Sequence, residues 1–221
     1  MNFERAIISA LLLIAAGFQL SSTETTSPSD TAHAGLSFLP AIVPGTTTSD
    51  KTFEVDNMYS CVYFRVKHMK ASNFYGRFNK VSGEFKIDAD NLDNSFVNIK
   101  VDVNSVDTND EARDKFLKGQ AFFSVKEFST MSFKSTSIAK KSDDTFTITG
   151  NLTLHGKSNE VTFDAAHTGT ANVSPRWGLR SGYEAIFDID RKDYGMAYGT
   201  QGGFMGHDIR LMISLHGMLS K

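Results

Sequence analysis

The chain has 221 residues, of which 40% are hydrophobic, and its 23 Lys and Arg nearly balance 25 Asp and Glu for a formal charge of −2. A single Cys excludes an internal disulfide scaffold, and 4 Pro with an ordinary apolar content exclude collagen-like and fully disordered chains. The lack of a basic excess argues against nucleic-acid binding. The length suits one large domain, and all-β barrels often reach this size.

The chain begins with a short apolar segment typical of export signals. An uncharged apolar run of 13 residues, 6–18, follows Arg5. As a helix this run would be roughly 20 Å long, which is short of a hydrocarbon core of about 30 Å. We therefore expect a signal peptide over residues 1–20, cleaved between about 20 and 34, and a periplasmic or secreted protein. An uncleaved membrane anchor is the alternative.

Residues 21–50 have the composition of a linker. Ser or Thr occupies 13 of these 30 positions, and Pro28, Pro40 and Pro44 interrupt the remainder. No apolar face repeats along the segment, so its composition predicts a Ser/Thr-rich tether rather than a packed element. The folded domain is expected over residues 51–221.

From Lys51 onward, apolar and polar residues alternate with a period of two. This alternation predicts antiparallel strands with one wet face and one buried face. Asp143-Asp144 and Gly202-Gly203 are turn signals, and Gly76 and Gly83 predict bends. The alternating runs lie at residues 52–56, 61–67, 78–87, 97–103, 131–138, 146–154, 161–165, 183–189 and 209–215.

One segment breaks the alternation. Residues 109–119 contain good helix formers, with acids in the first turn and Lys118-Gly119 at the end. They predict a short helix. Ala112, Phe116 and Leu117 would share a face suited to covering one end of a barrel.

About eight amphipathic antiparallel strands that must hide their edges usually close into a barrel. An eight-stranded barrel either fills its interior with side chains or holds one small ligand. The 18 Phe suit both a filled core and an apolar lining. Periodicity alone does not decide between these two interiors.

Five blocks of sequence, in a fixed order along the chain, carry a further pattern. They are V-K-H-M at 66–69 with G-R-F at 76–78; S-V-D-T at 105–108 with R-D-x-x-L at 113–117 and A-F-F at 121–123; S-F-K-S at 132–135; T-G-N-L-T-L-H-G at 149–156; and D-R-K-D-Y-G-M at 190–196. In these blocks the chain resembles the YceI-like family. The resemblance covers nearly all of the chain beyond the linker.

The resemblance implies an all-β fold, namely an extended eight-stranded antiparallel lipocalin-like barrel with one short helix capping an end. It also implies export and a long apolar tunnel that encloses a polyisoprenoid, such as an isoprenoid quinone or a polyprenyl phosphate. Burying a prenyl chain yields roughly 25 cal/mol per Å². From the family blocks and the inward parity of the strands, we expect the tunnel to be lined by Val62, Phe64, Val66, Phe85, Ile99, Val101, Phe133, Ile148, Leu152, Phe163, Phe187 and Leu211.

Two polar residues are further candidates for ligand binding. His68 shares the inward parity of Val62, so it would contact a ligand head or serve as a hydrogen-bonded structural histidine at the barrel mouth. Arg113 would bind a pyrophosphate head or, together with Asp114, take part in ion pairs that lock the helix. Arg191 is expected to belong to a structural network around a turn.

The leading hypothesis is binding, storage or transport of a polyisoprenoid lipid by a protein that is not an enzyme. A non-lipid interaction module built on a filled barrel is the alternative. An enzyme with His68 as acid or base is less favoured, because no nucleophile motif is present. The six His show no metal-ligand spacing and Cys61 has no partner, so we expect no metal and no cofactor. A homodimer is compatible with the sequence.

Overall fold

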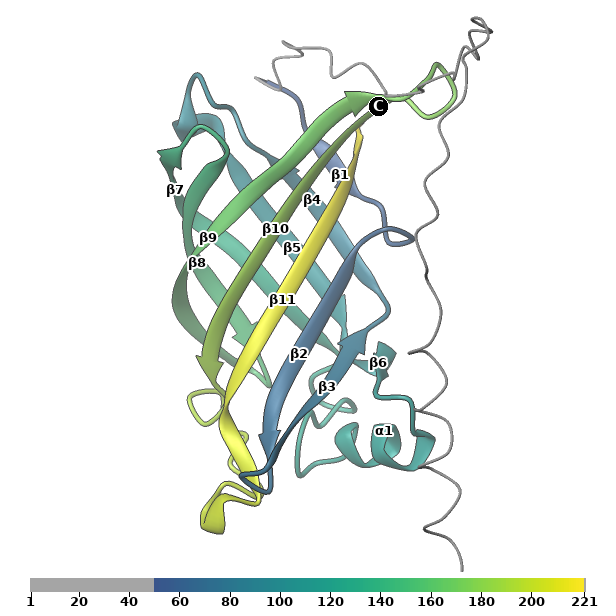
Figure 1. Cartoon of the computed structure of the whole chain (residues 1–221), viewed down its shortest axis with the longest axis vertical. Helices are drawn as coiled ribbons and strands as arrows, with labels where there is room; N and C mark the ends of the chain where they lie inside the picture. Colours follow the sequence, from purple (N-terminus) through teal and green to yellow (C-terminus); the bar gives the residue numbers. More distant parts are fainter. Residues whose placement is uncertain (1–49, 221) are drawn as a thin grey trace, which may run out of the picture. The chain divides into compact units, whose positions relative to one another are not determined.

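The period-two alternation of the sequence becomes one antiparallel sheet that curls into a barrel (Figure 1). The computed structural model describes residues 50–220. The predicted signal peptide, residues 1–20, and all but the end of the predicted linker, residues 21–50, lie outside the described residues. The strands are β1 Phe53–Val55, β2 Cys61–His68, β3 Ser72–Phe78, β4 Val81–Lys86, β5 Phe96–Asp102, β6 Val106–Asp107, β7 Thr130–Ser142, β8 Thr145–Leu154, β9 Lys157–Asn172, β10 Leu179–Asp190 and β11 Met205–Leu219; the helical elements are η1 Leu92–Asn94, η2 Val103–Ser105, α1 Glu111–Leu117 and η3 Gln201–Gly203.

The 11 strands of the sheet form eight barrel positions, because three positions each hold two strands in succession. These successive strands are β1 and β2, β3 and β4, and β5 and β6. β1 pairs with both β4 and β11, which closes the ring. Every neighbouring pair is antiparallel. The structure therefore confirms the predicted eight-stranded antiparallel barrel.

The chain bends where β1 passes into β2, where β3 passes into β4 and where β5 passes into β6. These three bends are joined by hydrogen bonds. The side chain of Asn57 accepts a hydrogen bond from the Val81 N–H at 2.6 Å. Ser105 accepts two more, through its carbonyl from the Asn79 N–H at 3.1 Å and through its hydroxyl from the Lys80 N–H at 3.0 Å. These contacts replace ladder hydrogen bonds that the bends interrupt. The three bends therefore form one hydrogen-bonded corner of the barrel.

Four buried aromatic side chains fill the barrel interior at the end opposite α1. We call this cluster the aromatic plug: Phe53, Phe85, Phe146 and Tyr183. The Phe85 ring centroid lies 5.7 Å from that of Phe53 and 5.5 Å from that of Tyr183, and Phe146 lies 6.4 Å from Tyr183. Gly217 allows this packing, since a Cβ there would lie 2.5 Å from Phe85 Cζ and 2.7 Å from Phe53 Cβ.

Helix α1 lies beside the other end of the barrel (Figure 1) and is less amphipathic than expected. Of the three residues predicted to share a covering face, only Leu117 is buried; Ala112 is exposed and Phe116 is 50% exposed. That prediction was wrong for two residues, because only the last turn of this 7-residue helix reaches the interior. The buried Phe122 continues the cover beyond the helix. Within residues 50–220, no helix has the length and apolar content needed to cross a membrane.

Buried Thr108 holds α1 against the barrel. Asp114 Oδ1 accepts hydrogen bonds from the Thr108 backbone N–H at 2.9 Å and from its hydroxyl at 2.5 Å. Arg113 donates from Nε to the Thr108 hydroxyl at 2.9 Å and from Nη2 to the Thr108 carbonyl at 2.6 Å. The two charged residues therefore lock the helix through a neutral partner, and the ion pairs expected for them are replaced by these bonds.

Gly217→Val should destabilise the barrel by about 1–3 kcal/mol, because the added methyl groups overpack the aromatic plug. Urea unfolding measures this loss. Ala166→Val is the matched control, since Ala166 is an exposed position on β9, and its effect should stay within about 0.5 kcal/mol. Equal losses in the two variants would contradict the packing role of Gly217.

Thr108→Val keeps the shape of the side chain and removes the hydroxyl that joins Arg113 to Asp114. We expect it to lower the free energy of unfolding by about 1–3 kcal/mol, because part-buried Asp114 and the Nε of exposed Arg113 each lose their hydrogen bond to this hydroxyl. Thr147→Val is the control: its hydroxyl binds Asp164 at 2.8 Å on the exposed outer wall, where the loss should be near zero. A Thr108→Val protein as stable as wild type would show that this lock is not needed.

Candidate functional site

An interior cavity of about 170 Å³ lies inside the barrel. A single water needs about 10–15 Å³ of such space, so the cavity has room for a ligand. Along β10 its wall extends from Tyr183 to Ile189, which corresponds to roughly 20 Å of strand. The cavity is therefore elongated.

The wall formed by β7 to β11 shows that the barrel is hollow. Phe133, Phe163, Phe187 and Leu211 point inward and line the cavity, yet each is only half-buried. These inward side chains therefore keep part of their surface uncovered. The neighbouring residue on β10, Ile186, points outward and is 65% exposed. The sequence left open whether side chains fill the interior or line a space for a ligand. The structure has the lined space.

All the apolar residues predicted for the tunnel line this cavity. Contact with a ligand stays a prediction for each of them. They come from eight of the strands and are Val62, Phe64, Val66, Phe85, Ile99, Val101, Phe133, Ile148, Leu152, Phe163, Phe187 and Leu211.

The two polar candidates do not line the cavity. His68 has the predicted parity but stands at the last position of β2, where its ring packs edge-on against Phe204 at 5.5 Å. Arg113 is held by Thr108, and its guanidinium lies over the Phe74 ring at 4.6 Å. Both lie outside the cavity wall, and their contact with the head of a ligand stays a prediction. For His68, strand parity fixes the direction of the side chain and not its depth along the barrel.

Several lining residues lie outside the alternating runs and were missed. Leu117, Phe122 and Phe123 come from α1 and the segment after it, and Met196 and Arg191 come from the connection between β10 and β11. No periodic signal marks residues in connections. The family blocks at 113–117, 121–123 and 190–196 were the signal that could have identified them.

The two ends of the cavity differ in polarity. At the aromatic plug, burial raises the pKa of Tyr183 to about 12, so its hydroxyl stays neutral. At the α1 end the buried residue Arg191 is among the lining residues. The remaining lining residues are apolar except Ser132 and Glu184, and Glu184 is exposed. Arg191 therefore supplies the buried charge of the cavity.

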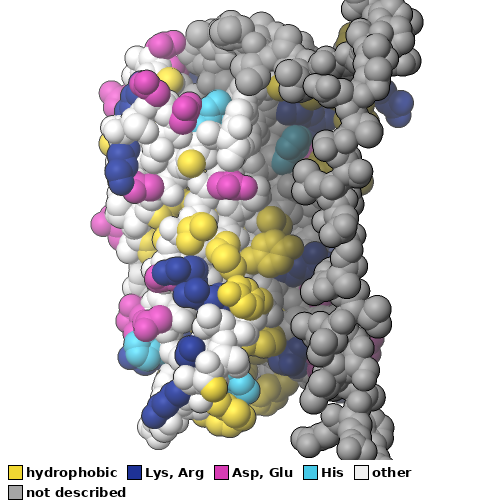
Figure 2. All heavy atoms as spheres, in the orientation of Figure 1, with side chains coloured by type: hydrophobic (Ala, Val, Ile, Leu, Met, Phe, Trp, Pro, Cys, Tyr) yellow, Lys and Arg dark blue, Asp and Glu magenta, His cyan; other side chains and the backbone are white. Residues whose placement is uncertain are grey.

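On the face that Figure 2 shows, hydrophobic side chains gather in the middle and lower part of the barrel wall, among polar and charged ones. Exposed Tyr63, Tyr75 and Ile186 lie on β2, β3 and β10. The wall also carries surface ion pairs such as Arg210 with Asp188 at 2.9 Å. That ion pair lowers the pKa of Asp188, first through the hydrogen bond from Arg210.

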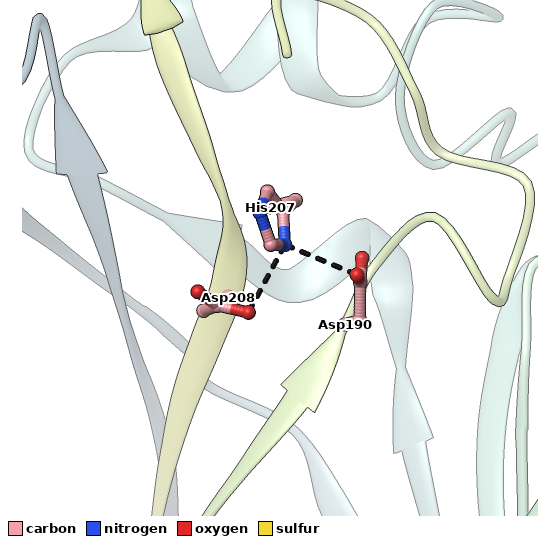
Figure 3. Close-up of side chains that lie close together, drawn as sticks. All are labelled: Asp190, His207 and Asp208. Atoms are coloured by element: carbon pink, nitrogen blue, oxygen red, sulfur yellow. Dashed lines mark ion pairs between the residues drawn. The ribbon is translucent and has the colours of Figure 1, made fainter.

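One group of residues in the described part of the chain has the geometry of a metal site (Figure 3). Asp190 and Asp208 face each other across β10 and β11, and His207 Nδ1 lies 3.0 Å from a carboxylate oxygen of each. Lys192 Nζ lies 3.2 Å from the same oxygen of Asp190. The cluster is thus already occupied by a cation of the chain itself and lies partly open to solvent. The absence of a bound metal stays a prediction.

Comparison with known proteins places the chain among relatives of the same architecture. Residues 53–216 match the model of the YceI-like domain. A UPF0312 protein of Yersinia pestis is 36% identical over 173 residues, covering 78% of this chain and 88% of that protein. A UPF0312 protein of Yersinia enterocolitica is 36% identical over 166 residues, covering 75% and 84%.

Solved structures agree with this architecture. The YCEI protein of Campylobacter jejuni has a TM-score of 0.62 at 26% identity, with 70% of this chain and 90% of that chain covered. BcnA of Burkholderia cenocepacia has a TM-score of 0.66 at 22% identity, covering 73% and 98%. A polyisoprenoid binding domain from Saccharophagus degradans has a TM-score of 0.59 at 15% identity, covering 76% and 98%, which shows a shared fold. From the matched domain and its relatives, the chain belongs to the YceI-like family.

Proposed function

We propose that this protein binds a polyisoprenoid lipid, either an isoprenoid quinone or a polyprenyl phosphate, and stores or carries it in the barrel cavity. The observation that carries the proposal is the ring of inward, half-buried apolar side chains around an elongated cavity, with Phe163 and Phe187 stacked at 4.3 Å on its wall. Cavities lined in this way stay dry and accept apolar molecules. A prenyl chain brings apolar surface along its whole length, and its burial yields roughly 25 cal/mol per Å².

Family membership supports the same proposal. The Saccharophagus degradans domain that shares the fold is described as polyisoprenoid-binding. The barrel of the present chain keeps the features that such binding requires: closure of the ring, an apolar wall and an elongated interior. An interaction module built on a filled barrel fits these features less well, since a filled barrel needs no cavity.

We propose binding rather than catalysis. No His, Cys, Asp or Lys is among the residues that line the described cavity. His68 packs on Phe204 and Asp114 is held by Thr108, so the acid and base considered from the sequence are not gathered at the cavity. Catalysis by general acid and base needs such groups within hydrogen-bond reach of the substrate.

We also propose that the protein is exported to the periplasm or secreted, with the apolar segment at residues 6–18 as the signal. Subcellular fractionation and N-terminal sequencing of the mature protein test this. We expect a soluble exported form that begins between about residues 20 and 34. A full-length chain recovered with membranes would support the uncleaved anchor instead.

Leu211→Trp should abolish lipid loading, because the larger indole would occupy the cavity. Leu211 lines it beside Phe187, its cross-strand neighbour on β10. Native mass spectrometry and lipid extraction measure the amount of prenyl lipid per protein. We expect a loss of about tenfold or more, with little change in thermal stability because the indole fills empty space. Leu152→Trp offers a second blocking variant if Leu211→Trp does not fold.

Ile186→Trp is the matched control, since Ile186 adjoins Phe187 on β10 and points to solvent. It should load as much lipid as wild type. Wild-type protein that extracts and accepts no prenyl lipid would overturn the proposed function. Equal loading of the Leu211→Trp and Ile186→Trp proteins would show that the lipid binds elsewhere.

A further inference from the structure

The wall of the barrel is interrupted between β9 and β10. The pairing of these two strands stops at Ala165 and Ala185, although both strands continue beyond these residues. Residues 160–163 of β9 therefore pair with β8 alone, and residues 187–190 of β10 pair with β11 alone. We call the stretch of wall between these two segments the β9–β10 window.

A bulge accounts for the divergence of the two strands. Their register shifts between Gly182 and Tyr183, three pairs before the ladder ends. Opposite this point on β9, Gly169 has a φ of 145°, which lies in the region that favours glycine. A bulge bends its strand and increases the local twist, so the strands beyond it no longer keep a common ladder.

Hydrogen bonds bound the window at its far end. The side chain of Asn159 donates to the carbonyl of Asp193 at 3.3 Å. His155 Nδ1 lies 3.1 Å from the carbonyl oxygen of Tyr194. These contacts join the turn between β8 and β9 to the loop between β10 and β11. The window is therefore a bounded interruption, with a complete ladder at one end and these contacts at the other.

Two stacked rings occupy the window from the inside. Phe163 on β9 and Phe187 on β10 lie at facing positions just beyond the last ladder pairs, with ring centroids 4.3 Å apart and planes 7° apart. Both line the cavity and both are half-buried. Because no ladder pair joins the strands here, moving them apart separates these rings without breaking a ladder. Elsewhere in the wall the same movement would break backbone hydrogen bonds.

The two ends of the cavity are closed more firmly. The aromatic plug fills one end, and the buried lining residues Leu117 and Phe122 cover the other. Arg191 also holds the loop between β10 and β11 at the α1 end. Its guanidinium donates hydrogen bonds to three backbone carbonyls, at 2.6 Å to Met196, 2.7 Å to Tyr198 and 2.9 Å to Gly206. A ligand that entered at either end would have to displace this packing.

The wall beside β3 is also interrupted, but it is covered. β6 pairs with only two residues of β3, Arg77 and Phe78. Helix α1 lies over the rest of that strand, where the guanidinium of Arg113 lies 4.6 Å from the centroid of the Phe74 ring. The outward residues at the middle of the β9–β10 window are exposed by contrast. The window thus has neither a complete ladder nor a covering element.

We propose that prenyl lipids enter and leave the cavity sideways, through the β9–β10 window, and that the stacked rings of Phe163 and Phe187 act as its gate. The proposal rests on the proposed function and names the route to the same cavity. A prenyl chain is thin and apolar, so it passes between two rings without removing a charge from water. The Phe163 ring also packs 5.3 Å from that of Phe133, which continues the aromatic surface into the cavity.

A cross-link over the window tests the route. Thr162 and Asp188 are exposed at its middle, one on each strand. In full-length protein with Cys61→Ser, the changes Thr162→Cys and Asp188→Cys provide two thiols that a cleavable bifunctional reagent joins. Lipid is exchanged with phosphatidylcholine vesicles that carry an isoprenoid quinone or a polyprenyl phosphate. The cross-linked protein should load and release lipid about tenfold or more slowly than the same protein without the link, because the link prevents opening. Cleavage of the link should restore both rates.

Asp188→Cys combined with Arg210→Cys is the matched control. Asp188 and Arg210 are ladder partners on β10 and β11, and both double variants lose the ion pair between them. A link in this control bridges strands that are already paired, so it should leave the loading and release rates of that variant as they were. Equal slowing by the two links, or no slowing by the link over the window, would overturn the proposed route.

Phe187→Ala tests the gate without a cross-link, and its result stands even if the two thiols cannot be joined. A gate residue hinders passage in both directions, so loss of the ring should raise the loading rate as well as the release rate, by about threefold to tenfold. Phe133→Ala is the comparison, because Phe133 lines the cavity within ladders on both sides. It should raise the release rate alone. Faster release without faster loading in Phe187→Ala would overturn the gate. Failure of the wild-type protein to load either lipid would instead count against the proposed function.

Discussion

Closure of the sheet is the constraint on which the rest of the structure depends. The 3-residue strand β1 pairs with β4 on one side and β11 on the other, and through it the sheet returns on itself as a ring. Backbone N–H and C=O groups of the wall then find partners in neighbouring strands, although the pairing of β9 with β10 stops at Ala165 and Ala185. The interior side chains are therefore not needed as hydrogen-bond partners, and the interior can be apolar without being filled.

A hollow interior forgoes the dispersion contacts of a packed core, and the structure concentrates its packing at the two ends. The aromatic plug occupies one end, and a second buried cluster of Leu154, Ile189, Tyr194 and Met196 occupies the end where β8 and β10 stop. Between them lie the half-buried walls. This distribution explains why the loops between strands contribute lining residues. Met196 and Arg191 line the cavity from the segment between β10 and β11, which packs at the α1 end.

Much of the wall could be predicted from the sequence, because alternation encodes which face a side chain takes. Phe187 and Leu211 were placed correctly by parity, while His68 shares the parity and lies beyond the cavity. The bends were not predictable: Gly76 and Gly83 suggested them, but the chain breaks at Asn79 and Lys80, where Ser105 supplies partners distant in sequence. Arg191 was expected to be structural, and its three carbonyl contacts fit that view. Its position in the cavity wall is set by tertiary placement, which alternation along a strand does not encode.

The aromatic plug has a consequence for ligand length. Its four rings come from β1, β4, β8 and β10, strands that are themselves fixed in the closed ring, so the plug is a rigid floor rather than a movable side chain. If the tail of a bound prenyl lipid stands on this floor, the length of the cavity from the aromatic plug to the α1 end limits the length of chain that fits. Isoprene units beyond that length must fold back inside or push the head past the α1 end into solvent. The barrel would then discriminate among prenyl lipids by their number of units.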